Sequence, residues 1–323
     1  MPKPLHPPGL LSALCLVLIL AGCAAPVTPE PQTPVSLKLS WSPGIQFIGF
    51  YVAQAKGYYA EENLDVSLLH IEEAAEMNQT PGKVARRELD FGLGGQSLIL
   101  IHQDMPLVMI ASLYQFTPAA LFFRRELGIQ TPADLKGRSV AIKSKAWEAL
   151  IDALLDSFGL APTDITKVPA GFDMTPFYDG EVDVWAGWIT NEVIIARDHG
   201  LDIATLPLYE YGIRNNDNML YTSQELAASD PEMVVGFLRA SLRGWDWAVQ
   251  HPAEAVDLFI ARYPEQAARR DFHLAAFEAS IPLIEPRGVQ AGNLDCSAPQ
   301  FRDVILKPEL CDSSFLQKAR ESR

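Results

Sequence analysis

Residues 35–69 read VSLKLSWSPGIQFIGFYVAQAKGYYAEENLDVSLL. Apolar and polar side chains alternate from Val35 to Trp41, as they do in a half-buried strand. The stretch from Ile48 to Lys56 predicts a helix, and Gly57 follows it at the position where helices favour glycine. A second strand is predicted over Leu64–Leu69. A strand, a helix and a strand in succession are typical of an α/β sheet.

The same alternation continues toward the C-terminus, which predicts α/β lobes with largely parallel sheets. The residues Gly94-Gly95-Gln96-Ser97 are expected to open a helix. The other predicted elements are a short helix over 82–88, strands over 106–114 and 139–142, a capped turn over 131–134, and helices over 147–158 and 231–250.

The N-terminal 22 residues have the layout of a secretory signal. Lys3 precedes an apolar run, Gly9–Leu20, that is shorter than the ~20 residues of a comfortable membrane span. The run ends in Leu20-Ala21-Gly22-Cys23, which resembles the lipobox of bacterial lipoproteins. The resemblance implies that Cys23 is lipidated and becomes the mature N-terminus, whereas a plain signal peptide with a chance match is the alternative.

Residues 23–35 are rich in proline and lack hydrophobic periodicity. Such a segment favours extended conformations and cannot pack a core. We therefore expect a lipid-anchored linker between the membrane and the folded body, although a tail without a role would have the same composition.

The charge of the chain excludes several classes of partner. The sequence has 26 Lys and Arg against 40 Asp and Glu, and residues 1–22 contain only Lys3, so the mature formal charge is 25 − 40 = −15. This balance argues against nucleic acid, which demands basic surfaces, and against electrostatic docking to anionic lipid. About 300 residues remain after processing, enough for two lobes with separate cores.

The four cysteines predict no metal site. Cys15 leaves with the signal and Cys23 is the anchor, which leaves Cys296 and Cys311. These two could form a disulfide in an oxidising exterior or remain free thiols, since sequence does not give the Cα separation that a bond requires. No histidine pattern accompanies them.

An ordered series of motifs carries a family resemblance over residues 36–265. The chain resembles the periplasmic binding proteins for thiamine precursors, riboflavin, sulfonates and related nutrients. The motifs are Trp41-Ser-Pro, Phe50-Tyr-Val-Ala53, Gly57-Tyr-Tyr, Glu61-Glu-Asn-Leu-Asp-Val66, Asp90-Phe-Gly, Asp134-Leu-Lys-Gly137, Gly180-Glu-Val-Asp183, Asp230-Pro-Glu, Phe237-Leu-Arg-Ala240, Gly244-Trp245 and His251-Pro-Ala-Glu-Ala-Val256.

The resemblance implies the type II periplasmic-binding-protein fold, in which two α/β lobes are joined by two crossing segments. Lobe one would comprise residues 36–116 and 216–323, and lobe two residues 117–215. The chain would cross near Gln115–Pro118 and return near Asn216–Leu220. The ligand would lie in the cleft between the lobes.

Ligands of open α/β sheets lie beyond the carboxyl ends of strands. Aromatic side chains there can stack on a flat ring, and polar ones can bind its edge. Core packing is the alternative for each aromatic residue, as we expect for Trp245 and Trp247. The candidates are Trp41, Phe47, Tyr51, Gln96, Ser97, Tyr114, Gln115, Trp147, Phe172, Trp185, Trp188, Asn191 and Glu192.

Glu192 resembles in position a ligand-binding acid of the thiamine-precursor binders, although a solvated helix charge is the alternative. Lys143 and Lys145 could meet an anionic group, but lysines are usually solvated.

The resemblance implies a monomeric, extracytoplasmic lipoprotein that binds a small molecule and delivers it to an ABC permease and its ATPase. It would touch the membrane through its N-terminal lipid only and would need no cofactor. A sensory subunit that presents ligand to a receptor would use the same chemistry.

The ligand is open among three classes. Ser42-Pro-Gly-Ile-Gln-Phe47 replaces a more polar segment of the thiamine-precursor binders, and the many aromatic candidates suit a wide ring. We therefore favour riboflavin over formylaminopyrimidine, and both over a sulfonate. The remote alternative is an enzyme, because the thiamine-pyrimidine synthase resembles this chain over the same opening motif. That enzyme carries a cysteine-rich run, whereas residues 24–295 contain no cysteine.

Overall fold

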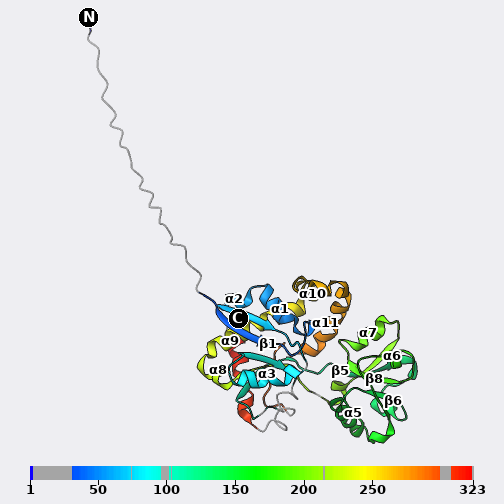
Figure 1. Cartoon of the computed structure of the whole chain (residues 1–323). Helices are drawn as coiled ribbons and strands as arrows, with labels where there is room; N and C mark the ends of the chain where they lie inside the picture. The colour runs from blue at the N-terminus through cyan, green and yellow to red at the C-terminus, as the bar shows by residue number, and fades with distance from the viewer. Residues whose placement is uncertain are drawn as a thin grey trace. The chain divides into compact units, whose positions relative to one another are not determined.

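Two five-stranded sheets organise the chain (Figure 1). The structure is a computed structural model, and it describes residues 1, 2, 31–73, 75–95, 102, 104–213, 215–298 and 307–321. The strands of one sheet come from residues 33–114 and 217–223, and those of the other from residues 119–207. Most of the predicted signal and linker, including Cys23, lies outside the described residues, as do Gln96 and Ser97.

Sheet one has the strand order β2-β1-β3-β10-β4. β1 pairs in parallel with β2 and β3, whereas β10 enters from far along the sequence and runs antiparallel between β3 and β4. Its strands are β1 (Thr33–Lys38), β2 (Leu64–Leu69), β3 (Phe91–Gly94), β4 (Leu107–Tyr114) and β10 (Asp217–Ser223).

Sheet two repeats this plan with the order β7-β6-β8-β5-β9. β6 pairs in parallel with β7 and β8, and β5 runs antiparallel to both β8 and β9. Its strands are β5 (Ala119–Arg124), β6 (Ser139–Ile142), β7 (Thr166–Pro169), β8 (Val184–Trp188) and β9 (Ile203–Pro207).

The expectation of largely parallel sheets is wrong. Four of the described strand pairings are parallel and four are antiparallel. The antiparallel pairings belong to β10 in sheet one and β5 in sheet two. These are the first strands after the chain passes from one sheet to the other, so each enters its new sheet against the direction set by its βαβ neighbours.

Helices flank both sheets (Figure 1). Among the described residues, none of them combines the length and the apolar character needed to cross a membrane. The helices are α1 (Ile48–Ala55), α2 (Tyr58–Glu61), α3 (Ala75–Ala85), α5 (Lys145–Ser157), α6 (Thr175–Tyr178), α7 (Glu192–Asp198), α8 (Gln224–Ser229), α9 (Pro231–Gln250), α10 (Pro252–Arg262), α11 (Arg270–Ile284) and α13 (Ser314–Glu321).

Two segments connect the sheets and contact each other. The backbone N–H of Thr117 donates to the carbonyl of Asn215 at 2.8 Å, and the rings of Phe116 and Tyr209 stack with their centroids 5.0 Å apart. Gln115 is tied into sheet one, because its amide donates to the carbonyls of Ser112 and Asn293. The connections are thus paired rather than independent.

The C-terminal segment covers the outer edge of β4. Gly292 and Cys311 form isolated bridges with Ser112 and Met109 of that strand. A disulfide joins Cys296 to Cys311, whose Cα atoms are 5.8 Å apart. The bond that the sequence left open is therefore present, and it fastens the segment that protects an edge strand from pairing with another chain.

Removing this disulfide should lower the stability of the fold. The bond closes a loop with a sequence separation of 15, and loop-closure entropy for that length corresponds to about 3 kcal/mol of stability. We expect the Cys296→Ser/Cys311→Ser variant to show a correspondingly lower free energy of unfolding in urea. Treatment of the wild-type protein with dithiothreitol should reproduce the loss, and dithiothreitol should not affect the variant. Equal stability of variant and wild type would contradict a stabilising role for the bond.

Candidate functional site

Lys143 and Trp188 lie at the carboxyl ends of neighbouring parallel strands, β6 and β8. Trp147 lies one turn into α5, which begins after Ser144; the Ser144 hydroxyl accepts a hydrogen bond from the backbone N–H of Trp147. Glu192 begins α7, which follows β8. Because both loops leave the same edge of sheet two, residues separated by about 50 positions in the sequence meet there. We call Lys143, Trp147, Trp188, Asn191 and Glu192 the lobe-two cluster.

The two tryptophans of the lobe-two cluster contact each other. Their ring centroids are 5.4 Å apart and their planes meet at 65°. Trp147 is buried, and Trp188 is half-buried at the end of its strand. An edge-to-face pair of this kind is rigid and favourable. The two rings form a continuous aromatic surface, which we call the aromatic wall.

Lys143 and Glu192 form a buried ion pair beside this wall. The Lys143 Nζ atom lies 2.5 Å from Glu192 Oε1, and the two side chains are only 7% and 9% exposed. Glu192 Oε2 accepts from the backbone N–H of Trp188 at 3.0 Å and from the Asn191 amide at 3.4 Å. The ammonium also lies 5.0 Å from the centroid of the Trp147 ring. Charge and aromatic surface are therefore combined in one cluster.

Gly187 makes room for this arrangement. A Cβ atom at that position would lie 3.0 Å from both Glu192 Cδ and a ring carbon of Phe122. The carboxylate thus packs directly on the backbone of β8, where a larger residue would displace it.

Trp41 is the exposed aromatic residue at the carboxyl end of β1. Its side chain is 46% exposed, and its carbonyl is 3.2 Å from His70 Nδ1. A carbonyl can only accept, so Nδ1 carries the proton and His70 Nε2 accepts from the Tyr263 hydroxyl at 2.7 Å. Burial, reinforced by Arg262 and Lys38, lowers the pKa of His70, which favours this neutral form. The Trp41 loop is therefore held by a chain of hydrogen bonds.

A polar segment at the second connection faces the same loop. Asn218 adopts a left-handed backbone conformation with φ of 47°, and its amide donates to the carbonyl of Gln46 at 2.9 Å. Burial raises the pKa of the neighbouring Asp217, which accepts a hydrogen bond from the backbone N–H of Asn218. The start of β10 is thus fixed against the loop that carries Trp41.

Several predicted site residues lie in the cores instead. The side chains of Phe47, Tyr51, Tyr114 and Trp185 are between 0% and 3% exposed, and burial raises the pKa of both tyrosines. Successive residues of a strand face opposite sides. Trp185 therefore packs on Phe177, with ring centroids 6.2 Å apart, on the other face of β8 from Ala186 and Trp188.

Gln115 and Phe172 have different surroundings again. The side-chain amide of Gln115 is occupied by two carbonyls of the fold. Phe172 follows β7 and is 90% exposed. Neither belongs to the lobe-two cluster. Trp245, by contrast, is fully buried as expected, and Trp247 is half-buried and stacks on His251 with ring centroids 4.5 Å apart.

Two polar residues next to the candidate aromatics were not selected from the sequence as site residues. From the sequence, Lys143 is expected only to meet an anionic group, and no role is predicted for His70. Both directly follow predicted strands, which is the signal that could have identified them. Their polar partners, Glu192 and Tyr263, are distant in the sequence, so no local sequence pattern predicts which residue each of them contacts.

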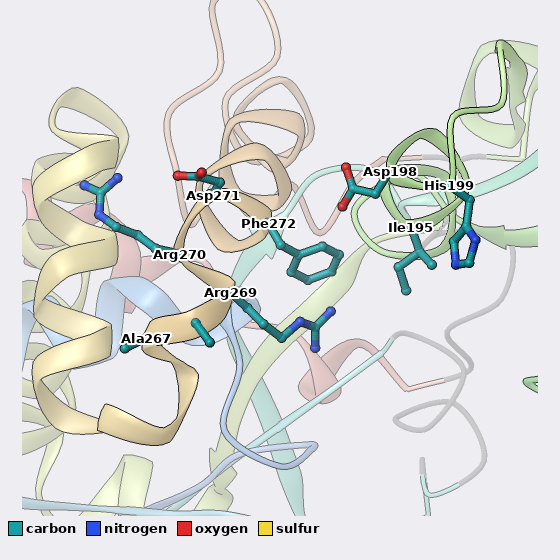
Figure 2. A pocket seen from close by; sticks show the side chains of 9 residues that line it. Ile195, Asp198, His199, Ala267, Arg269, Arg270, Asp271 and Phe272 are labelled. Atoms are coloured by element: carbon teal, nitrogen blue, oxygen red, sulfur yellow. The ribbon is translucent and has the colours of Figure 1, made fainter.

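A hollow of about 630 Å³ lies between α7 and the junction at which the 3₁₀ helix η6 (Pro264–Arg269) passes directly into α11. Figure 2 shows the side chains of Arg269 and Phe272 extending toward α7. None of the predicted site residues lines this hollow, although it shares α7 with Glu192. Among the residues that the structure describes, no group of three or more His, Cys, Asp or Glu is arranged to hold a metal ion.

Curated relatives include binding proteins and an enzyme. The chain is 28% identical over 290 residues to the riboflavin-binding protein RibY of Chloroflexus aurantiacus, covering 84% of this chain and 82% of the relative. It is 25% identical over 284 residues to the formylaminopyrimidine-binding protein of Halalkalibacterium halodurans, covering 85% and 81%. It is also 25% identical over 263 residues to the 4-amino-5-hydroxymethyl-2-methylpyrimidine phosphate synthase of Legionella pneumophila, covering 78% and 80%.

A solved structure and a family model complete the comparison. The putative periplasmic sulfonate-binding protein SsuA of Methylobacillus flagellatus superposes with a TM-score of 0.62 at 16% identity, covering 91% of this chain and 95% of that one. The fold is therefore the expected type II periplasmic-binding-protein fold. The model of the family described as NMT1/THI5 like matches residues 44–255. Because this match covers more than half of the chain, the chain belongs to the NMT1/THI5-like family.

Proposed function

We propose that this chain is the solute-binding lipoprotein of an ABC importer and that its ligand is riboflavin. The observation that carries the proposal is the lobe-two cluster, in which an aromatic wall stands beside a buried ion pair at the carboxyl ends of β6 and β8. A flat ring system stacks on aromatic faces, and a few polar groups bind its edge. The relative named for riboflavin binding supports this ligand.

The two lobes contribute differently in this proposal. Trp188 supplies the stacking surface of lobe two, and Trp41 supplies an exposed indole from lobe one. Asn191 and Glu192 lie at the edge of the wall. Residues 36–116 and 216–323 form lobe one and residues 117–215 form lobe two, with the ligand captured between them.

The remaining parts of the proposal concern location and chemistry. Cys23 anchors the protein through lipid on the extracytoplasmic face, and the permease receives the ligand there. We infer a binding protein rather than an enzyme, because residues 24–295 contain no cysteine where the resembling synthases carry a cysteine-rich run. Formylaminopyrimidine is the second candidate ligand, since a relative is named for binding it.

A fluorescence titration tests the ligand. Stacking on an electron-rich indole should quench riboflavin fluorescence as protein is added. Trp188→Ala should weaken riboflavin binding by about tenfold to a hundredfold, because loss of base–aromatic stacking costs about 1–3 kcal/mol. Trp247→Ala is the matched control, since Trp247 is also half-buried but stacks on His251 in another part of the fold.

A competitor separates the two ligands. If formylaminopyrimidine binds tightly while riboflavin neither quenches nor competes, the second candidate replaces the first. If neither compound binds, both ligand assignments fail. Lipidation is tested separately, because Cys23→Ser should abolish the incorporation of labelled palmitate.

A further inference from the structure

Glu192 has little capacity left to bind a ligand. Oε1 accepts from Lys143, and Oε2 accepts from the backbone N–H of Trp188 and from Asn191. The carboxylate is also packed on Gly187, where an added Cβ would lie 3.0 Å from Glu192 Cδ. With these contacts, Glu192 holds Lys143 and Asn191 in place rather than binding a ligand itself.

Lys143, in contrast to Glu192, has hydrogen-bonding groups that remain unused. An ammonium group has three N–H donors, and among the described residues Glu192 Oε1 is the acceptor that Lys143 contacts. Its side chain is 7% exposed, so the ammonium has lost most of its water. A buried donor without an acceptor is costly. Lys143 therefore has hydrogen-bonding capacity at the place where a ligand would lie.

The surroundings determine what kind of acceptor would fit. The ammonium lies 5.0 Å from the centroid of Trp147, which in turn packs against Trp188. The hydrogen-bond acceptors of a flat heterocycle lie at its edge, so Lys143 would contact the edge of a ring stacked on this wall. Because Glu192 already neutralises the lysine, the pair carries no net charge and favours an uncharged acceptor such as a carbonyl over a sulfonate or phosphate.

We propose that Lys143 is a specificity-determining residue that donates a hydrogen bond to a ring carbonyl oxygen of the ligand, and that Glu192 is the positioning residue that holds it. This inference rests on the proposed function and sharpens it. The ligand class becomes an uncharged heterocycle with a carbonyl at its edge, a description that the isoalloxazine ring of riboflavin meets. It also assigns Glu192 a different role from that of a ligand-binding acid.

Infrared difference spectroscopy with ¹³C-labelled riboflavin tests the hydrogen bond directly. Binding to the wild-type protein should move one ring carbonyl stretch to lower frequency, as donation from a cation weakens the C=O bond. The double variant Lys143→Met/Glu192→Gln removes the donor without leaving a charge buried. In that variant the stretch should lie at higher frequency, and riboflavin affinity should fall by about tenfold to a hundredfold.

Two further variants complete the design. Lys145→Met is the matched control, because Lys145 is 96% exposed and its ion pair with Glu148 lies on the surface; both the carbonyl frequency and the riboflavin affinity should be unchanged. Glu192→Gln keeps the lysine, so the lowered frequency should persist with a smaller loss of affinity. Near-ultraviolet circular dichroism confirms that each variant is folded.

The possible outcomes distinguish failure of the Lys143 assignment from failure of the proposed riboflavin-binding function. If riboflavin binds the wild type and the folded double variant equally well, with the same carbonyl frequency, Lys143 does not donate a hydrogen bond to the ligand. The proposed riboflavin-binding function would still stand. If riboflavin fails to bind the wild type, the proposed function fails and this inference with it. A lowered frequency that disappears only with Lys143 supports both.

Discussion

Lys143→Met is expected to lower the free energy of unfolding by about 3–5 kcal/mol, because it leaves the Glu192 carboxylate buried without its cation. The two side chains are 7% and 9% exposed, so water cannot replace the lost partner. The carboxylate is also clamped by Gly187 and the backbone N–H of Trp188. Urea denaturation at neutral pH, followed by tryptophan fluorescence, measures the loss.

Two variants distinguish loss of the pair from loss of a lysine. Lys143→Met/Glu192→Gln removes both charges, keeps an acceptor for the backbone N–H of Trp188 and should recover most of the stability, since replacing both members of a buried ion pair is often without cost. Lys145→Met should change the free energy of unfolding by less than about 1 kcal/mol, as is usual for an exposed pair. If Lys143→Met were as stable as Lys145→Met, the pair would not be buried as described.

Gly244→Ala should destabilise the protein by about 3 kcal/mol, at the upper end of the usual cost of overpacking. Gly244 lies in α9 where that helix crosses α1, and an added Cβ would lie 2.1 Å from the carbonyl oxygen of Gly49 and 2.7 Å from Ala53 Cβ. Backbone atoms cannot move aside alone, so the helices must separate. Overpacking of this kind typically costs about 1–3 kcal/mol and occasionally more.

Gly236→Ala on the same helix is the matched control. A Cβ there would meet a flexible side-chain oxygen of Glu62 at 3.2 Å, and alanine favours a helix by about 1 kcal/mol over glycine. We therefore expect thermal unfolding of Gly236→Ala near the wild-type temperature and that of Gly244→Ala well below it. Similar unfolding temperatures for the two variants would contradict close approach of the helices at Gly244.

The parts of the fold with strong local periodicity were predictable. The strand over Leu64–Leu69 and the helix over Pro231–Gln250 have the bounds expected from their patterns. No strand was predicted for β5, because AALFFR is a short apolar run without alternation, and periodicity alone does not distinguish such a run from a buried helix segment. The helix expected over residues 82–88 is instead α3, Ala75–Ala85, which contains Pro81. The predicted helix started after this proline, whereas the helix in the structure continues through it.

The location of the candidate site at strand ends was predictable from the sequence, whereas the contacts between its residues were not. Strand ends identify Trp41, Trp147 and Trp188 because ligand binding at the carboxyl ends of parallel strands is a general property of the fold. Trp185 is expected at a loop–helix junction after Asp183 but lies within β8, so strand alternation places it in the core. The role of Glu192 depends on Lys143, 49 positions earlier, and no local pattern encodes such a pairing.

The position of β10 in sheet one has a consequence for the order in which the protein acquires its structure. Sheet two is complete once residues 119–207 are available, whereas β3 and β4 of sheet one must wait for residues 217–223 to fill the place between them. Pairing over such a sequence distance is slow, because a long loop must close before any contact is made. During synthesis, β4 would therefore emerge well before its partner strand. Until then the apolar side chains of β4, which are buried along its whole length in the finished sheet, have no partner strand to pack beside.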